Sequence, residues 1–158
     1  MPAAIANRSV DGVSVFDPFA YFAEQRLGPE HVTFQDSAIY SELYLLTVKE
    51  ATLKDSPDLA LKMMRALIAA RNFIRSNPAE SKVIVARYTK LDPGTVDAIW
   101  GNFVFAPSLT ARLIDCQQQE AAWAKANGTF AGSSVPDFRN RLAPDALRQV
   151  DPTAVAIQ

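Results

Sequence analysis

SPDLALKMMRALIAARNFIRSNPAE, residues 56–80, carries the clearest secondary-structure signal in the chain. Ser56 is a good helix cap, Pro57 suits a first helical turn, and Asp58 complements the positive end of the helix dipole. Apolar side chains then recur at helical spacing, at Ala60, Met63, Met64, Leu67, Ala70 and Ile74. Asn77-Pro78 begins another helix by the same logic. The stretch therefore predicts two consecutive helices.

Helix signals continue toward the C-terminal end. Asp92-Pro93-Gly94-Thr95 begins a short third helix, and Ser108 can cap a fourth that Gly128 would end. One row of this fourth helix holds Leu109, Leu113, Cys116, Glu120 and Trp123. Beyond it we expect a loop at 132–137 and helical turns at 138–142 and 145–150. The chain after residue 50 is thus predicted to be nearly all helix.

Strand signals are confined to the chain before residue 50. Val10–Phe16 alternates apolar residues with small or polar ones, which predicts a short strand, and Asp17-Pro18 ends it and begins a helix. Val32–Phe34 is a second candidate strand. Leu43–Val48 is rich in β-forming residues and is predicted to be a buried strand. The predicted fold class is α/β, mostly helical with a few strands near the N-terminal end.

The composition excludes several classes of chemistry. Of 158 residues, 49% are hydrophobic and 21% charged, and the net charge is −1, so neither disorder nor broad attraction to nucleic acid is expected. A single cysteine, Cys116, and a single histidine, His31, cannot form an internal disulfide or a closed zinc site. Neither glycine-rich nucleotide pattern occurs. We therefore expect no cofactor and no catalytic Cys–His pair.

Export and membrane signals are also missing from the sequence. Met1–Arg8 lacks the basic segment and long apolar stretch of a signal peptide. The longest apolar segment, Leu59–Ile74, is interrupted by Lys62, Arg65 and Arg71, so it is not expected to span a membrane. As written, the sequence predicts a soluble chain without an export address.

Several short motifs follow one another in a distinctive order. RSVDGVSVFDP, at residues 8–18, reads as a strand that ends in an aromatic-x-Pro turn, and Tyr40–Val48 reads as a crossing strand. The later motifs are Ser56-Pro57, Asn77-Pro78-Ala79-Glu80, Phe103–Pro107, Gln117–Gln119 and Val135–Phe138. This order resembles the C-terminal half of the periplasmic substrate-binding proteins that serve ABC transporters for nitrate, sulfonates, taurine and thiamine precursors.

The resemblance implies a partial type II periplasmic-binding-protein fold. Residues 1–40 would be the end of one α/β lobe (strand, turn and helix), and residues 41–158 the crossover strand and helical C-terminal part of the other lobe. It also implies a truncated protein that acts as the solute-binding component of an importer, or as a fragment of one. Hinge closure would hold a small anionic solute, and an ABC permease would be the membrane partner. The implied location is periplasmic, although the chain shows no signal peptide.

Five residues are the predicted solute-binding positions. Ser14, Phe16 and Asp17 lie at the carboxyl end of a predicted strand, where ligands gather in open α/β sheets. Phe16 can cover an apolar part of a solute and Asp17 can accept from a cationic group, but core packing and helix capping are the alternatives. The resemblance places Tyr40 and Ser41 where the chain enters the other lobe. Their hydroxyls can bind an oxyanion, or they belong to an ordinary loop.

Two other functions stay open at this stage. Thiamine-pyrimidine synthases resemble the same fold, but they use a Cys/His-rich region. With one residue of each type, this chain is not expected to be an enzyme. A helical interaction domain would instead fold with a partner. Exposed apolar helix faces would also drive self-association.

Overall fold

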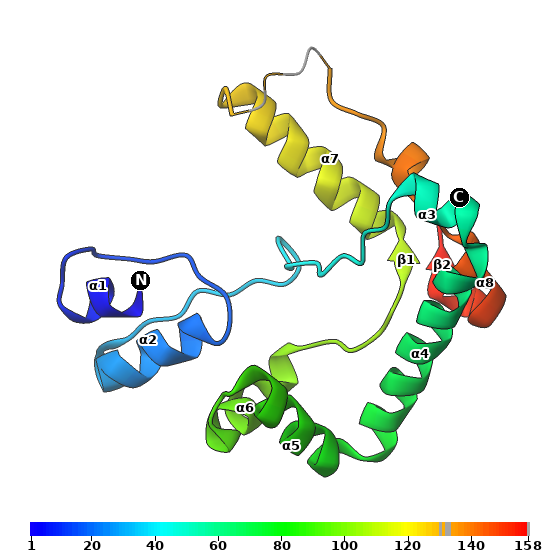
Figure 1. The fold of residues 1–158 in the computed structure, drawn as a ribbon. Helices are drawn as coiled ribbons and strands as arrows, with labels where there is room; N and C mark the ends of the chain where they lie inside the picture. Colours follow the sequence, from blue (N-terminus) through cyan, green and yellow to red (C-terminus); the bar gives the residue numbers. More distant parts are fainter. Residues whose placement is uncertain (130, 132–133, 158) are drawn as a thin grey trace. The chain divides into compact units, whose positions relative to one another are not determined.

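The computed structural model describes residues 1–129, 131 and 134–157 (Figure 1). It divides into unit 1, residues 1–35 and 73–105, and unit 2, residues 36–72 and 106–158. Helical residues make up 61% of the described chain, beside two short strands, which confirms a mostly helical α/β protein. Residues 132 and 133 of the predicted loop lie outside the described residues. The assignment of residues 1–40 and 41–158 to two lobes stays a prediction.

Unit 1 is built from short helices. Helices α1 and α2 pack on each other, and so do α5 and α6. The elements are α1 (Pro2–Ala6), α2 (Phe19–Leu27), the 3₁₀ helix η1 (Gly28–Glu30), α5 (Pro78–Thr89), α6 (Pro93–Ile99) and the 3₁₀ helix η2 (Trp100–Asn102). Asp92 caps α6 as predicted, because its Oδ1 accepts from the N–H of Gly94 at 2.8 Å and of Thr95 at 3.3 Å. This cap fixes the start of the helix that supplies the buried Val96 and Ile99.

The end of α6 is held by aromatic and charged side chains. The rings of Trp100 and Phe105 lie with centroids 4.8 Å apart. The Lys82 ammonium lies 5.8 Å from the centroid of the Trp100 ring and forms an ion pair with Asp97. These contacts join α5 to η2, the turn that carries Asn102, which donates to the Asp17 carboxylate.

Unit 2 contains both described strands. Strand β1 (Leu109–Thr110) pairs in parallel with β2 (Val155–Ala156), with Leu109 opposite Val155. Its helices are α3 (Glu50–Asp55), α4 (Pro57–Ser76, whose end from Phe73 belongs to unit 1), α7 (Ala111–Ala126), α8 (Asp145–Val150) and the 3₁₀ helices η3 (Phe138–Arg141) and η4 (Pro152–Ala154). The chain passes directly from β1 into α7. Leu113 and Ile114 of α7 and Leu147 of α8 are buried and form apolar core.

An ion pair links α4 to the C-terminal segment of unit 2. The Arg71 guanidinium Nη1 lies 2.6 Å from Asp151 Oδ2, and both side chains are half-buried. The Thr153 hydroxyl donates to Asp151 Oδ1 at 2.6 Å. These hydrogen bonds, first from Thr153 and then from Arg71, lower the pKa of Asp151 below its ordinary value of 3.8. The ion pair therefore stabilises the folded unit only while Asp151 is ionised.

We expect the Asp151→Asn substitution to destabilise the chain at neutral pH, with a penalty that shrinks on acidification. A carboxyl whose pKa is lower in the folded state adds its full stabilising free energy above its pKa in the unfolded state. That stabilisation is lost as the pH falls through the pKa of the folded state. Urea unfolding of both proteins, from neutral pH to below the ordinary pKa of aspartate, measures the difference. Asp145→Asn, which removes an exposed partner of Arg148, should have little effect at any pH. A pH-independent penalty for Asp151→Asn would contradict this account.

The strands predicted near the N-terminal end are wrong. Val10–Phe16, Val32–Phe34 and Leu43–Val48 form no strand in the structure, and the two strands lie after residue 108. A strand needs a neighbouring strand to satisfy its backbone N–H and C=O groups. No described strand pairs with Leu43–Val48, and its apolar side chains are exposed rather than buried, with Tyr44 at 70% and Leu46 at 59%. High β propensity is therefore not sufficient for this segment.

The helix predictions are confirmed, with shifts at their ends. Helices α4 and α5 begin at Pro57 and Pro78, as their caps indicate. Helix α7 begins after Thr110 rather than at Ser108, because residues 109–110 pair as β1 before the helix starts. Gly128, with φ of 71°, lies just beyond the end of α7, where a positive φ favours glycine. The short helix α3, at residues 50–55, has no counterpart among the sequence predictions.

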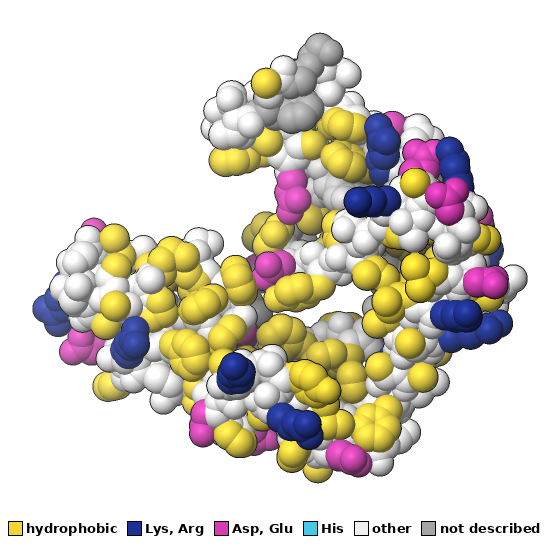
Figure 2. All heavy atoms as spheres, viewed as in Figure 1, with side chains coloured by type: hydrophobic (Ala, Val, Ile, Leu, Met, Phe, Trp, Pro, Cys, Tyr) yellow, Lys and Arg dark blue, Asp and Glu magenta, His cyan; other side chains and the backbone are white. Residues whose placement is uncertain are grey.

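Large apolar side chains reach the surface of several helices. Figure 2 shows hydrophobic side chains among lysines and arginines over α4 and α5. The exposed residues there include Leu59, Met63, Val83, Ile84 and Tyr88. Over the ranges that the structure describes, none of the helices combines the length and apolarity needed to cross a bilayer.

Candidate functional site

A polar cluster in unit 2 contains two of the five predicted solute-binding residues. It consists of Ser37, Tyr40 and Ser41 from the loop before α3, and Arg112, Cys116 and Glu120 from α7. We call it the Arg112 cluster. The three α7 residues follow one another at intervals of four, so they lie on one face of that helix.

Arg112 holds the loop against α7. Its Nη2 donates to the carbonyl oxygen of Ser37 and, at 3.0 Å, to Oγ of Ser41. A guanidinium also carries donors on Nη1 and Nε, and neither has a hydrogen-bond partner among the described residues. The Arg112 side chain is exposed, so these donors are accessible from solvent. The arrangement leaves part of the guanidinium for an external oxyanion, next to the Ser41 hydroxyl.

Glu120 forms the accepting end of the cluster. Cys116 Sγ donates to Glu120 Oε1 at 3.5 Å. Burial, then the hydrogen bond to Glu120 and its negative charge, raise the pKa of the Cys116 thiol, while Arg112 acts in the opposite direction. Desolvation, followed by the charge of Glu120, also raises the pKa of Tyr40, although the residue as a whole is 57% exposed. Both groups therefore keep their protons at neutral pH and donate toward the carboxylate.

We expect Cys116 to react more slowly with an alkylating agent than an unperturbed cysteine does at the same mildly alkaline pH. The reactive species is the thiolate, and a raised pKa reduces its population. Glu120→Gln removes the negative charge, so the midpoint of the pH–rate profile should move to lower pH. Iodoacetamide labelling followed by mass spectrometry measures the rate. Glu80→Gln, at an exposed position on α5, serves as the control. An unchanged midpoint in Glu120→Gln would contradict the assigned role of this carboxylate.

The other three predicted residues lie in unit 1. Asp17 uses both carboxylate oxygens within the protein, because Oδ1 accepts from the backbone N–H of Tyr21 at 3.3 Å and Oδ2 from Nδ2 of Asn102 at 2.8 Å. This geometry favours the capping alternative for Asp17. Phe16 is 51% exposed, so it is not a core residue. Its ring meets the Phe19 ring edge-on, with the two centroids 5.7 Å apart. Ser14 is exposed. A solute-binding role for these three residues stays a prediction.

Sequence reasoning missed Arg112 and did not give Glu120 a role. The row through Cys116, Glu120 and Trp123 was interpreted as one helix face with apolar neighbours. The intervals of four that join Arg112, Cys116 and Glu120 were the available signal, because they place a cation, a thiol and a carboxylate on one face. Contact with Tyr40 and Ser41 depends on tertiary structure, which these intervals do not encode.

Metal ligation receives no support from the described ranges, where no group of three or more His, Cys, Asp or Glu side chains is placed to hold an ion. Comparisons of the chain with family models, with curated proteins and with solved structures find no match. The resemblance to periplasmic substrate-binding proteins therefore stays an expectation based on the order of motifs.

Proposed function

We propose that this chain is the solute-binding component, or part of the solute-binding component, of an ABC-type importer. It would bind a small anionic solute of the nitrate, sulfonate or thiamine-precursor class at the Arg112 cluster. Binding would be non-covalent, and the loaded protein would deliver the solute to a membrane permease. The implied location is the periplasm, where such components work.

One observation carries the proposal. Tyr40 and Ser41, selected as solute-binding residues from sequence, lie in one cluster with a guanidinium that retains unused donors. Guanidinium groups bind oxyanions through their charge and their N–H donors, and Nη1 and Nε of Arg112 each keep a donor for one, while the Ser41 hydroxyl already donates to the carbonyl oxygen of Ser37 at 3.4 Å. The cluster therefore supports binding of an oxyanion more directly than it supports a reaction.

The carboxylate of Glu120 is compatible with an anionic solute. Glu120 lies about 12 Å along the axis of α7 from Arg112, by the rise per residue of an α-helix. That separation exceeds the screening length of about 8 Å at physiological salt, so Glu120 repels an anion at Arg112 only weakly, although it lies close enough to Tyr40 to raise the pKa of that hydroxyl. A solute that also carries an amine could place it toward Glu120. The cluster thus favours monoanions or amine-bearing anions.

Thermal-shift screening tests the proposal. The chain is heated with nitrate, methanesulfonate, taurine or a pyrimidine precursor of thiamine, and with chloride at the same ionic strength. A solute that binds the folded state raises the unfolding temperature in a concentration-dependent way. We expect at least one of these solutes to do so beyond the effect of chloride. A folded chain that none of them stabilises would contradict the proposal.

We also propose that the exposed apolar side chains on α5 drive self-association. Val83 and Tyr88 are largely exposed, and apolar patches of this kind associate in water. Light scattering over a range of concentrations should show mass increasing with concentration, together with binding of a hydrophobic dye. The double substitution Val83→Ser and Tyr88→Ser should reduce both signals. A monomer with low dye binding at all concentrations would contradict this expectation.

A further inference from the structure

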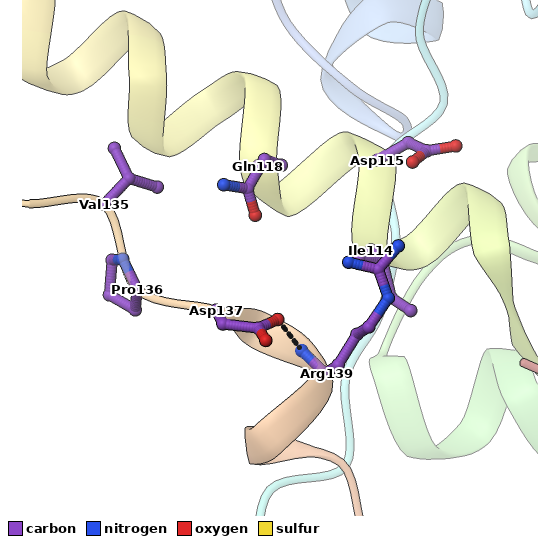
Figure 3. Close-up of a pocket in the computed structure, with 7 residues that line it drawn as sticks. All are labelled: Ile114, Asp115, Gln118, Val135, Pro136, Asp137 and Arg139. Atoms are coloured by element: carbon purple, nitrogen blue, oxygen red, sulfur yellow. Dashed lines mark hydrogen bonds between the residues drawn. The ribbon is translucent and has the colours of Figure 1, made fainter. Parts of the chain in front are cut away.

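A second polar site lies on α7, away from the Arg112 cluster. Figure 3 shows a groove between α7 and the segment that leads into η3. Its volume is about 300 Å³, and it is lined by Ile114, Asp115, Gln118, Val135, Pro136, Asp137 and Arg139. Successive residues of an α-helix are rotated by about 100°, which puts Ile114 and Gln118 on the face of α7 opposite Arg112 and Cys116. The groove is therefore separate from the proposed solute site.

The groove presents a cation that none of the described residues neutralises. The Arg139 side chain extends from η3 toward α7, with its guanidinium beside Ile114 (Figure 3). Its backbone N–H donates to Asp137 Oδ1 at 3.0 Å, but its guanidinium forms no ion pair or hydrogen bond within the described part of the chain. Gln118 projects from α7 toward the Val135–Asp137 segment and adds an amide. Both groups can donate to a carboxylate.

The same groove presents negative charge and apolar surface. Asp137 is held by the N–H of Arg139 and, at 3.2 Å, by Nδ2 of Asn140, which orients its carboxylate. Asp115 lies at the rim, with its carboxylate directed away from Val135 and Asp137 (Figure 3). Ile114 is buried beneath the groove, and Val135 and Pro136 form a half-buried wall. One cation without an internal partner, one oriented anion and an aliphatic wall therefore lie within a volume at the small end of ligand sites.

We propose that this groove binds a small zwitterionic α-amino acid with an aliphatic side chain. The ligand carboxylate contacts the Arg139 guanidinium and the Gln118 amide. The ligand ammonium contacts Asp137, and the side chain covers Val135 and Pro136. A simple anion leaves the carboxylates unpaired, and a simple cation leaves Arg139 unpaired. Because the charged groups are solvent-exposed, the affinity is expected to be about millimolar.

Two-dimensional NMR of the ¹⁵N-labelled full chain tests this inference, with L-leucine as the probe. Leucinamide, which lacks the carboxylate, and isocaproate, which lacks the ammonium, are the matched probes. Leucine should cause saturable shifts at amides of α7 and η3. Each matched probe should bind about tenfold more weakly, which corresponds to the loss of one charge-assisted contact.

Substitutions locate the site. Arg139→Gln should weaken leucine binding about tenfold. Asp137→Asn retains the oxygen that accepts from the Arg139 N–H, so it should weaken the binding of leucine but not the binding of isocaproate, which has no ammonium. Arg141→Gln makes the same charge change on an exposed residue outside the groove lining and should leave binding unchanged. Arg112→Gln should also leave leucine binding unchanged, so this test is independent of the proposed function. Three results would overturn the inference. Leucine could cause no saturable shifts up to tens of millimolar, the three probes could bind equally well, or Arg141→Gln could weaken leucine binding as much as Arg139→Gln does.

Discussion

Affinity for the most strongly stabilising solute of the thermal-shift screen is expected to fall about ten- to a hundredfold in the Arg112→Gln variant. Hydrogen bonds to charged groups contribute about 1.5–3 kcal/mol each, and a factor of ten corresponds to about 1.4 kcal/mol. Glutamine removes the charge and the donors on Nη1 and Nε while keeping a polar side chain. Calorimetric titration of the variant and the parent chain measures the change.

Two further variants separate binding from folding and from net charge. Arg65→Gln makes the same charge change on α4, at an exposed position outside the Arg112 cluster, and should leave affinity unchanged. Arg112→Lys keeps the charge but loses the planar array of donors, so it should retain only part of the affinity. Circular dichroism should be the same for all three variants. Equal losses in Arg65→Gln and Arg112→Gln would show that net charge, rather than this guanidinium, governs binding.

Unfolding free energy is expected to fall by about 2–5 kcal/mol in the Ile99→Ala variant. Ile99 is 5% exposed and lies in the small apolar core of unit 1, so truncation leaves a cavity that neighbouring side chains fill only partly. Domains are stabilised by about 5–15 kcal/mol in total, so the loss would be a large share of the stability of this unit. Urea unfolding in a Trp123→Phe background, which leaves Trp100 as the only tryptophan, reports on this region directly through its fluorescence.

The control for Ile99→Ala is an exposed residue of the same unit. Val104 is 88% exposed, and Val104→Ala should change the unfolding free energy by no more than about 0.5 kcal/mol. A similar effect of the two substitutions would mean that Ile99 is not buried in solution. It would then contradict the assignment of a core around α6.

The sequence was informative where structure depends on neighbouring residues. Pro57, Asn77-Pro78 and Asp92 mark helix starts through local steric and hydrogen-bonding preferences, and the helices begin there. Strands depend on a partner from elsewhere in the chain. Leu43–Val48 has strong β propensity but no pairing partner among the described strands, whereas Leu109–Thr110 pairs with Val155–Ala156 without a clear sequence signal.

The same distinction applies to the candidate site. Tyr40 and Ser41 were predicted from their hydroxyls and from the motif order, but Arg112 lies 71 positions beyond Ser41. Their meeting depends on how the loop packs on α7, which local patterns do not encode. Asp17 was predicted as the N-cap of α2, but Pro18 occupies that position. Asp17 lies one residue earlier, and its Oδ1 accepts from the Tyr21 N–H in the first turn.

The central claim is that Arg112 binds an oxyanion, and NMR of the arginine side chains tests it most directly. Methanesulfonate is titrated into the ¹⁵N-labelled full chain, and the Arg112 Nε–H signal, assigned by its loss in Arg112→Lys, is followed. The account predicts a saturable shift of this signal and no comparable shift at Arg65. The account would be contradicted if the chain is folded and the Arg112 signal does not move with methanesulfonate, nitrate, taurine or the pyrimidine precursor.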